Sequence, residues 1–303
     1  MRHARLPVVL GLVLACMLAG AATRAPAAAP PEWLTRLAAE PTPAYAAGAP
    51  ALVLFDHDAV RLDGRGRLVL TRRRAVRVLS AGGEEHAQAV ITYLSGRDTA
   101  KGLGAWLLRG GKEFKPKSQS RGWVDEVIDE DALFSEYRAK TYSCEDIAAP
   151  GDVFGFEATV EGGTLFTDQI NIWRSDLPAL AERYDLTLSS GWTLTARVDG
   201  ERPLVASRSA DGLTWSWVLR DRPYRPDEPY AAEEQWFDAR VLTTLQRPAG
   251  AAVVPGGPVS FSRWSELSMW NRDLAAGQCD RDPALAENVA RLTAGVADFR
   301  PDL

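Results

Sequence analysis

Few residues of this sequence could carry out nucleophilic chemistry. Cys144 stands in the segment Tyr142-Ser143-Cys144-Glu145-Asp146, and His57 and His86 are the histidines that could act as its base. A reactive thiol needs such a base and surroundings that stabilise the thiolate. We expect Cys144 in a strand beside two acidic side chains, which oppose thiolate formation. The sequence therefore predicts no catalytic nucleophile.

A second candidate is the tripeptide Asp56-His57-Asp58, because imidazole and carboxylate groups both bind metals. Side chains alternate between the two faces of a strand, so His57 would point away from both aspartates. The sequence contains no second cluster of histidine and cysteine that would complete a site. We therefore predict neither a metal site nor a cofactor.

Acidic residues are densest at Asp125, Glu126, Asp129, Glu130 and Asp131. This run has neither the spacing nor the glycine of a calcium-binding loop, and we expect a solvated loop or short helix. Paired carboxylates near aromatic residues also suit glycoside hydrolysis. A carboxylate-dependent β-sandwich hydrolase acting on glycans therefore remains the alternative function.

The ten tryptophans could form packed cores or a surface that binds sugars or peptides. Trp215 and Trp217 alternate with polar residues, as the core positions of a strand do. Trp192 and Trp236 are the two that could instead form exposed binding platforms. These two tryptophans are our candidates for ligand binding.

The N-terminus has the three parts of a secretory signal peptide. Arg2 and Arg5 precede the uncharged residues 6–22, which contain the small-residue triplet Ala19-Gly20-Ala21. This pattern predicts a signal peptide over residues 1–21, cleaved after Ala21, and export to the periplasm or beyond the cell. An uncleaved anchor and lipid attachment at Cys16 are the alternatives. After cleavage we expect no membrane span.

Export affects the expected state of Cys144 and Cys279, the cysteines that remain after cleavage. An oxidising compartment would allow these two residues to form a disulfide bond. Two free, buried thiols are the alternative, and it is the one we favour, although both stay open.

The composition excludes several classes of protein. Hydrophobic residues make up 46% of the chain and charged residues 25%, as in a globular protein. The formal net charge is −5, with both signs interspersed. Because nucleic-acid binding needs a concentrated basic surface, we expect no nucleic-acid partner.

From residue 51 onward, apolar residues recur at every second position. Phe154, Phe156 and Val160 illustrate this period, which is typical of half-buried strands. Dipeptides such as Asp199-Gly200 lie between these runs and favour tight hairpins. The sequence predicts a mainly β protein with two antiparallel, β-sandwich-like units, one over residues 51–182 and one over 183–246.

The ends of the chain are expected to be helical. Residues 22–50 are an Ala/Pro-rich tether with a short helix, and residues 247–258 are a linker rich in proline and glycine. In residues 259–303, Ser262 could cap one helix. Asp282 with Pro283 predicts the start of another helix.

Several segments, taken in order, resemble an exported bacterial domain of unknown function that stands before transglutaminase-like cores. The resemblance rests on these segments: Leu62-Asp63-Gly64, Gly82-Gly83-Glu84-Glu85, Ala105-Trp106-Leu107-Leu108-Arg109-Gly110-Gly111-Lys112, Ala149-Pro150-Gly151-Asp152-Val153-Phe154, Trp264-Ser265-Glu266-Leu267-Ser268-Met269-Trp270 and Asp282-Pro283-Ala284-Leu285. The catalytic residues of such cores are a cysteine, a histidine and an aspartate. Nothing in this chain resembles their nucleophile motif, a glycine-acid-cysteine step at a helix start, and Cys144 does not match it, so the resemblance carries over no catalytic residue.

The resemblance implies a non-catalytic, β-rich N-terminal domain of an exported transglutaminase-like protein, and therefore not an enzyme. Its expected partner is a protein or a cell-envelope polymer. A transglutaminase-like domain could dock on the C-terminal helices, where Leu285, Val289 and Leu292 are spaced to form one apolar stripe.

Overall fold

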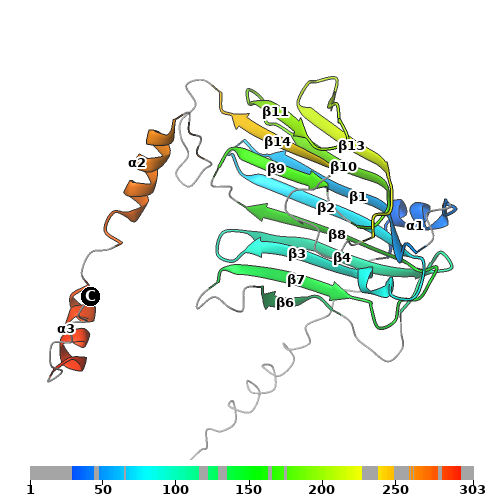
Figure 1. Cartoon of the computed structure of the whole chain (residues 1–303), viewed down its shortest axis with the longest axis horizontal. Coiled ribbons are helices and arrows are strands. Elements are labelled where there is room, and N and C mark those ends of the chain that lie inside the picture. The colour runs from blue at the N-terminus through cyan, green and yellow to red at the C-terminus, as the bar shows by residue number, and fades with distance from the viewer. Residues whose placement is uncertain are drawn as a thin grey trace, which may run out of the picture.

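The computed structural model confirms a mainly β protein with three short helices near its ends (Figure 1). The structure describes residues 29–43, 48–64, 66–115, 122–128, 135–162, 166–173, 176–226, 238–248, 259, 261, 263–278 and 282–294. The predicted signal peptide therefore lies outside the described residues. Within the described ranges, no helix is long and apolar enough to cross a membrane.

The largest element is a sheet of eight strands. Its order is β12 (Ser207–Arg208), β13 (Thr214–Arg222), β10 (Ala179–Thr187), β1 (Ala51–Leu62), β2 (Leu68–Val78), β8 (Val153–Gly162), β4 (Thr99–Arg109) and β5 (Lys112–Glu113). Neighbouring strands are antiparallel except β1 and β10, which pair in parallel. The boundary expected between residues 182 and 183 falls inside β10, so strands from both sides of it form one sheet.

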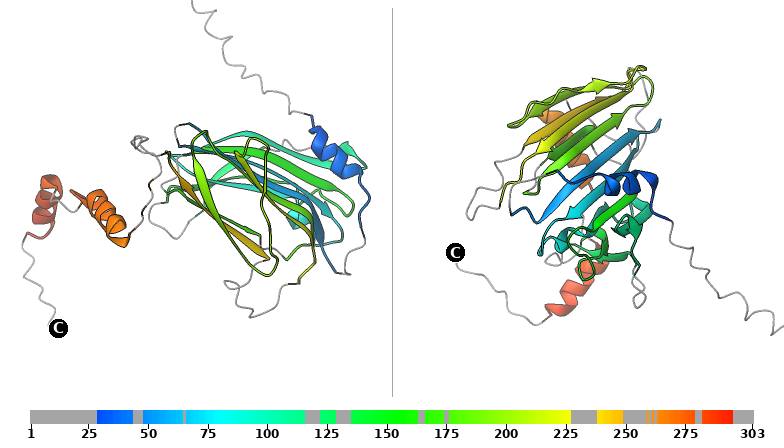
Figure 2. Two further views of the ribbon diagram at one scale, coloured as in Figure 1. Left: turned by 90° about the horizontal axis from the view of Figure 1, so that it is seen from above. Right: turned by 90° about the vertical axis from the view of Figure 1, so that its right-hand side faces the viewer.

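Two smaller sheets form the second layer. One consists of β11 (Thr193–Asp199), β14 (Ala239–Gln246) and β9 (Asp168–Trp173), and the other of β3 (Gln88–Leu94), β7 (Tyr137–Ser143) and β6 (Val124–Val127). Figures 1 and 2 show them over opposite ends of the large sheet. Strand β9 is the inner edge of one small sheet and β3 is the inner edge of the other, so both lie beside the middle of the large sheet.

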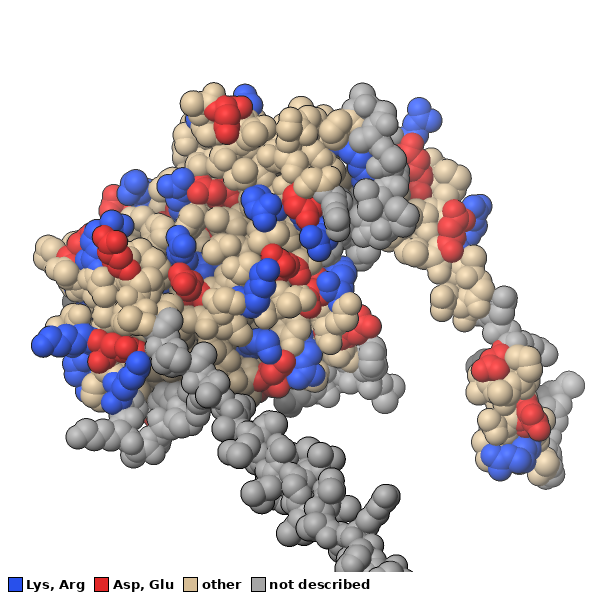
Figure 3. Space-filling model, turned by 180° about the vertical axis from the view of Figure 1, so that it is seen from behind, with Lys and Arg blue, Asp and Glu red and all other residues tan. Residues whose placement is uncertain are grey.

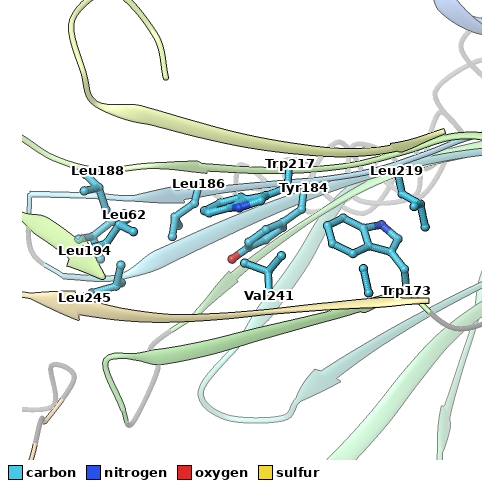
Figure 4. Packing of buried hydrophobic residues seen from close by; sticks show 11 residues of the cluster. Leu62, Trp173, Tyr184, Leu186, Leu188, Leu194, Trp217, Leu219, Val241 and Leu245 are labelled. Carbon is cyan, nitrogen blue, oxygen red and sulfur yellow. The ribbon is translucent and has the colours of Figure 1, made fainter. Parts of the chain in front are cut away.

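Each small sheet covers its own hydrophobic core. Under β14 and β9, the rings of Tyr184 and Trp217 stack at 5.6 Å, and Trp173 and Val241 close the core from the other layer (Figure 4). Under β3 and β7, the core includes Phe154 and other side chains of β8. The large sheet is therefore apolar at both ends of the face that carries the second layer.

The opposite face of the large sheet holds α1 (Glu32–Ala39), which the sequence predicted (Figure 2). Leu34 of this helix is fully buried against Leu52, Trp106 and other side chains of the sheet. Gly155 lies directly beneath Leu34, and a Cβ there would stand 2.4 Å from its Cδ1. Glycine is therefore required for this close approach. Beyond the helix, acidic and basic side chains intermingle across this face (Figure 3).

The C-terminal helices are α2 (Trp264–Ala275) and α3 (Pro283–Leu292). As predicted, Asp282 caps α3 by accepting a hydrogen bond from the Ala284 backbone N–H. No residue of either helix is buried. Both helices lie apart from the sheets (Figures 1 and 2), although Trp270 of α2 packs against Phe166 next to β9.

The Arg77 side chain links the end of α1 to the sheet through hydrogen bonds. Its guanidinium group donates hydrogen bonds to the carbonyl oxygens of Ala38 and Glu40 and to the hydroxyl of Thr42. Arg77 is only 9% exposed, and its burial lowers its pKa. The last carbonyl groups of a helix need such donors.

We expect Arg77→Ala to lower the free energy of unfolding by about 1.5–3 kcal/mol, because hydrogen bonds from a charged donor are lost. Arg36→Ala is the matched control, since Arg36 is exposed on the same helix. Urea denaturation of both variants measures the difference. Equal stability of the two variants would contradict the proposed role of Arg77.

Candidate functional site

The middle of the large sheet is charged on the face that carries the two small sheets. One cross-strand row runs Leu219, Glu182, Asp56, Arg74 and Phe156. Paired residues in neighbouring strands project to the same face. The row therefore starts in one hydrophobic core, crosses charged groups on three strands and ends in the other core.

The next row repeats this arrangement with Trp217, Tyr184, Asp58, Arg72 and Ala158. Its end residues belong to the two cores. We call the four central side chains, which are Asp56, Asp58, Arg72 and Arg74, the charged floor. The charged floor lies between the parts of the sheet that β9 and β3 cover.

Above the charged floor the protein is hollowed into a groove with two lobes. The lobe beside β9 has a volume of about 550 Å³ and is lined by Asn171, Trp173 and Arg222, among others. The lobe beside β3 has a volume of about 310 Å³ and is lined by His86 and Gln88, among others. Asp56, Arg72 and Arg74 line both lobes, so we call the whole hollow the central groove.

Two ion pairs stabilise the charges around the groove. Arg72 donates two hydrogen bonds of 2.6 Å to the Asp58 carboxylate. These bonds, acting against the effect of burial, raise the pKa of Arg72. Arg222 donates to both oxygens of Glu182, at 2.7 and 3.0 Å, in a fully buried pair. The geometry of both pairs is bidentate, which is the strongest arrangement for arginine and carboxylate.

Asp56 and Arg74 form a longer ion-pair contact without a hydrogen bond. The shortest ion-pair contact joins Arg74 Nε to Asp56 Oδ2 at 3.7 Å, which is beyond hydrogen-bonding distance. Burial raises the pKa of Asp56 above its usual 3.8, and Arg74 and Arg72 offset only part of this shift. Both side chains remain partly open to the groove, with exposed fractions of 27% and 34%.

Three polar atoms on the groove residues lack hydrogen bonds to described residues. They are Nε of Arg74 in the charged floor, Nε2 of His86 on one wall and Oδ1 of Asn171 on the other. Of these, His86 Nε2 does lie 3.4 Å from Glu85 Oε1, in an ion-pair contact. Buried polar groups normally have a partner. The central groove therefore has unused hydrogen-bonding capacity on its floor and on the wall that β9 forms.

The structure places Trp192 and Cys144, two candidates from the sequence, at different hydrophobic cores. Trp192 is half-buried against the core beneath β14, with the Arg247 guanidinium 5.8 Å from its ring centre. Cys144 is buried in the core beneath β3 and β7. Trp236 and Cys279 lie outside the described residues, so the pairing of Cys144 with Cys279 stays untested.

The tripeptide 56–58 divides between the two faces of β1 as expected. Asp56 and Asp58 point into the central groove, whereas His57 Nε2 contacts Asp185 Oδ2 at 3.0 Å on the other face. Burial would raise the pKa of Asp185, but hydrogen bonds from His57, Arg183 and Ser216 lower it to about 2. Asp185 stands between His57 and Ser216, whereas a catalytic triad needs the histidine in the middle.

The acidic run is described only in part, because Asp129, Glu130 and Asp131 lie outside the described residues. Asp125 accepts hydrogen bonds from Lys140, Tyr93 and Arg138. These bonds hold the pKa of Asp125 well below its usual range. Asp125 is therefore ionised at neutral pH and does not suit the role of general acid. Among the described residues, no group of three or more His, Cys, Asp or Glu side chains could hold a metal ion.

The charged floor was not predicted from the sequence. Arg72 and Arg74 stand at alternate positions of β2, as Asp56 and Asp58 do in β1. This spacing places four charged side chains on a face that would otherwise be core. The signal was therefore present, but strand pairing was needed to bring the four residues together.

Comparison with known proteins finds a family of domains of unknown function and several structures that resemble this chain. Residues 64–226, more than half of the chain, match the family described as "Domain of Unknown Function with solved-structure structure (DUF3857)". No curated protein matches the sequence. A crystal structure from Parabacteroides distasonis, described as a "putative protease", is similar with a TM-score of 0.53 and 14% identity. The similarity covers 64% of this chain and 40% of that one, and it shows a shared fold.

Two further structures are more distant. Yeast LTA4 hydrolase in complex with bestatin has a TM-score of 0.33 and 7% identity, over 71% of this chain and 32% of that one. An M1 zinc metallopeptidase from Deinococcus radiodurans has a TM-score of 0.30 and 10% identity, over 65% and 42%.

The two aspartates of the charged floor should differ in their effect on stability. Asp58→Asn should lower the free energy of unfolding by about 1.5–3 kcal/mol, because Arg72 loses its bidentate partner. Asp56→Asn should leave this free energy unchanged or raise it at pH 7, because it removes a carboxylate that burial disfavours.

The pH dependence of the free energy of unfolding tests the effect of Asp56. A carboxyl group whose pKa is raised in the folded state destabilises the protein as pH rises above 3.8 and the group ionises. The advantage of Asp56→Asn over wild type should therefore grow over this range and vanish below it. Urea denaturation at several pH values measures this difference in the free energy of unfolding. A loss of stability for Asp56→Asn at pH 7 would show that burial does not disfavour the Asp56 carboxylate.

Proposed function

We propose that this chain, which belongs to the DUF3857 family, is a non-catalytic, β-rich binding module that holds a protein or cell-envelope partner. The module is exported to the periplasm or beyond the cell and works beside a transglutaminase-like core. Export is supported by the N-terminal pattern of basic, apolar and small residues.

The central groove is the observation that carries this proposal. Its floor and one wall offer Arg74 Nε and Asn171 Oδ1 without hydrogen-bond partners among the described residues. Among the described residues that line the groove, none is a serine, threonine or cysteine that could act as a nucleophile beside His86. Unused donors and acceptors in a preformed hollow favour ligand binding over covalent catalysis.

The proposed place beside another domain is supported by how little of the Parabacteroides protein the similarity covers. The Parabacteroides protein is matched over 40% of its length, so a similar fold occurs there as one part of a longer chain. Domains of this kind commonly contact their neighbours through small surfaces.

The α3 helix offers such a surface. Leu285, Val289 and Leu292 are 62%, 50% and 70% exposed, and they form one apolar stripe. A soluble helix normally covers its apolar face. We propose that a transglutaminase-like domain docks on this stripe, and that without it the stripe causes self-association.

We therefore expect the purified chain from residue 22 onward to self-associate, and Leu285→Glu/Val289→Glu to be more monomeric with an unchanged Tm. Ala286→Glu/Ala290→Glu is the matched control, because it adds the same charge at the same spacing on exposed positions away from the stripe. Sedimentation and thermal melts measure both effects.

Two results would count against the proposal. A large fall in Tm for the stripe variant alone would mean that α3 packs on the sheets. Turnover of peptides or glycans by the purified chain would contradict a non-catalytic role and favour the hydrolase alternative.

A further inference from the structure

We propose that the central groove binds an extended peptide, which pairs as an added strand with β9 and directs a carboxamide side chain to Asp56 and Arg74. This inference rests on the proposed role as a binding module and assigns the site and the chemical class of its ligand. The ligand is a segment of another protein with Asn or Gln at the floor-facing position.

Open strand edges border the groove on both sides. Among the described residues, β9 pairs only with β14, and β3 pairs only with β7. Alternate N–H and C=O groups of such an edge strand lack partners within the sheet and can pair with another chain. An added strand of this kind is a common mode of peptide recognition.

The second layer is interrupted where the charged floor lies. Strands β9 and β3 both border this gap (Figure 1), and residues of both strands line the groove. Packed sheets stand about 10 Å apart, and side chains of a strand alternate between its faces. Every second side chain of a peptide paired with β9 would therefore point down to the charged floor.

The chemistry of the floor selects a neutral group with a donor and an acceptor. Arg72 already donates two hydrogen bonds to Asp58, which leaves Arg74 and Asp56 to meet a ligand. A carboxamide can accept a hydrogen bond from Arg74 through its oxygen and donate one to Asp56 through its nitrogen. A carboxylate would be attracted by Arg74 but repelled by Asp56, and an ammonium group would meet the reverse, so neither charged group is matched by both residues as a carboxamide is.

The outer surface of the layer favours apolar side chains at the other positions of the peptide. Ile170 and Ile172 of β9 are 61% and 52% exposed, and Val90 of β3 is 43% exposed. These side chains point away from the cores on the strands that border the groove. Outward-facing valines of an added strand would contact them as cross-strand neighbours.

The test uses the labelled peptide acetyl-Lys-Val-Thr-Val-Asn-Val-Thr-Lys-amide and fluorescence anisotropy with the purified chain from residue 22 onward. We expect saturable binding. Replacement of the peptide's Asn by Asp or Lys should weaken binding about tenfold, which corresponds to about 1.4 kcal/mol. N-methylation of alternate backbone amides, in the register that faces β9, should abolish it.

Protein variants locate the contact. Arg74→Met should weaken binding about tenfold or more, since a charged donor is lost. Arg73→Met is the matched control, because Arg73 is the next residue of β2 and contacts Glu157 on the other face. Asp56→Asn should weaken binding while the protein stays folded in thermal melts.

Absence of binding, equal binding of the N-methylated peptide in both registers, or an equal effect of Arg73→Met would overturn the inference. These outcomes leave the docking test on α3 unaffected. Cleavage or modification of the bound peptide, detected by mass spectrometry, would instead overturn the non-catalytic role and leave the peptide site standing.

Discussion

The arrangement of this protein depends on four charged side chains in the middle of a sheet face that is apolar at both ends. Asp56 and Asp58 of β1 lie beside Arg74 and Arg72 of β2. Full burial of ionised groups costs several kcal/mol per ion unless each is well paired. A continuous second layer would bury all four, so two separate sheets cover the apolar ends and leave the middle open.

This constraint links the fold to the proposed function. The split layer produces two hydrophobic cores, one beneath β14 and one beneath β3. It also leaves the facing edges of β9 and β3 without strand partners among the described residues. Asp58 and Glu182 are matched to arginines, which stabilises the groove, while Asp56 and Arg74 keep capacity for a ligand. Residues that burial disfavours are common at binding sites, where stability is given up for function.

Sequence patterns predicted the class of fold and the helices. The period of two in β8, with Phe154 and Phe156 inward, and the Asp282 cap of α3 are local signals, and both are confirmed. The parallel pairing of β1 with β10 could not be predicted, since it joins residues more than a hundred positions apart. The charged floor was missed for a different reason, because the register of the neighbouring strands β1 and β2 was needed to place Asp56 beside Arg74 and Asp58 beside Arg72. By contrast, the alternation that turns His57 away from Asp56 and Asp58 is local and was correctly predicted.

Residue-resolved hydrogen exchange tests the central claim most directly, because it reports which backbone amides of the second layer are paired. The account predicts that alternate amides of β9 and β3, those that face the groove, exchange rapidly. It also predicts that amides of β14 and β7, which pair on both sides, are protected, as are those of β1 and β2 beneath the groove. Equal protection of all amides in β9 and β14 would show that the second layer is closed over the charged floor, and would contradict the account.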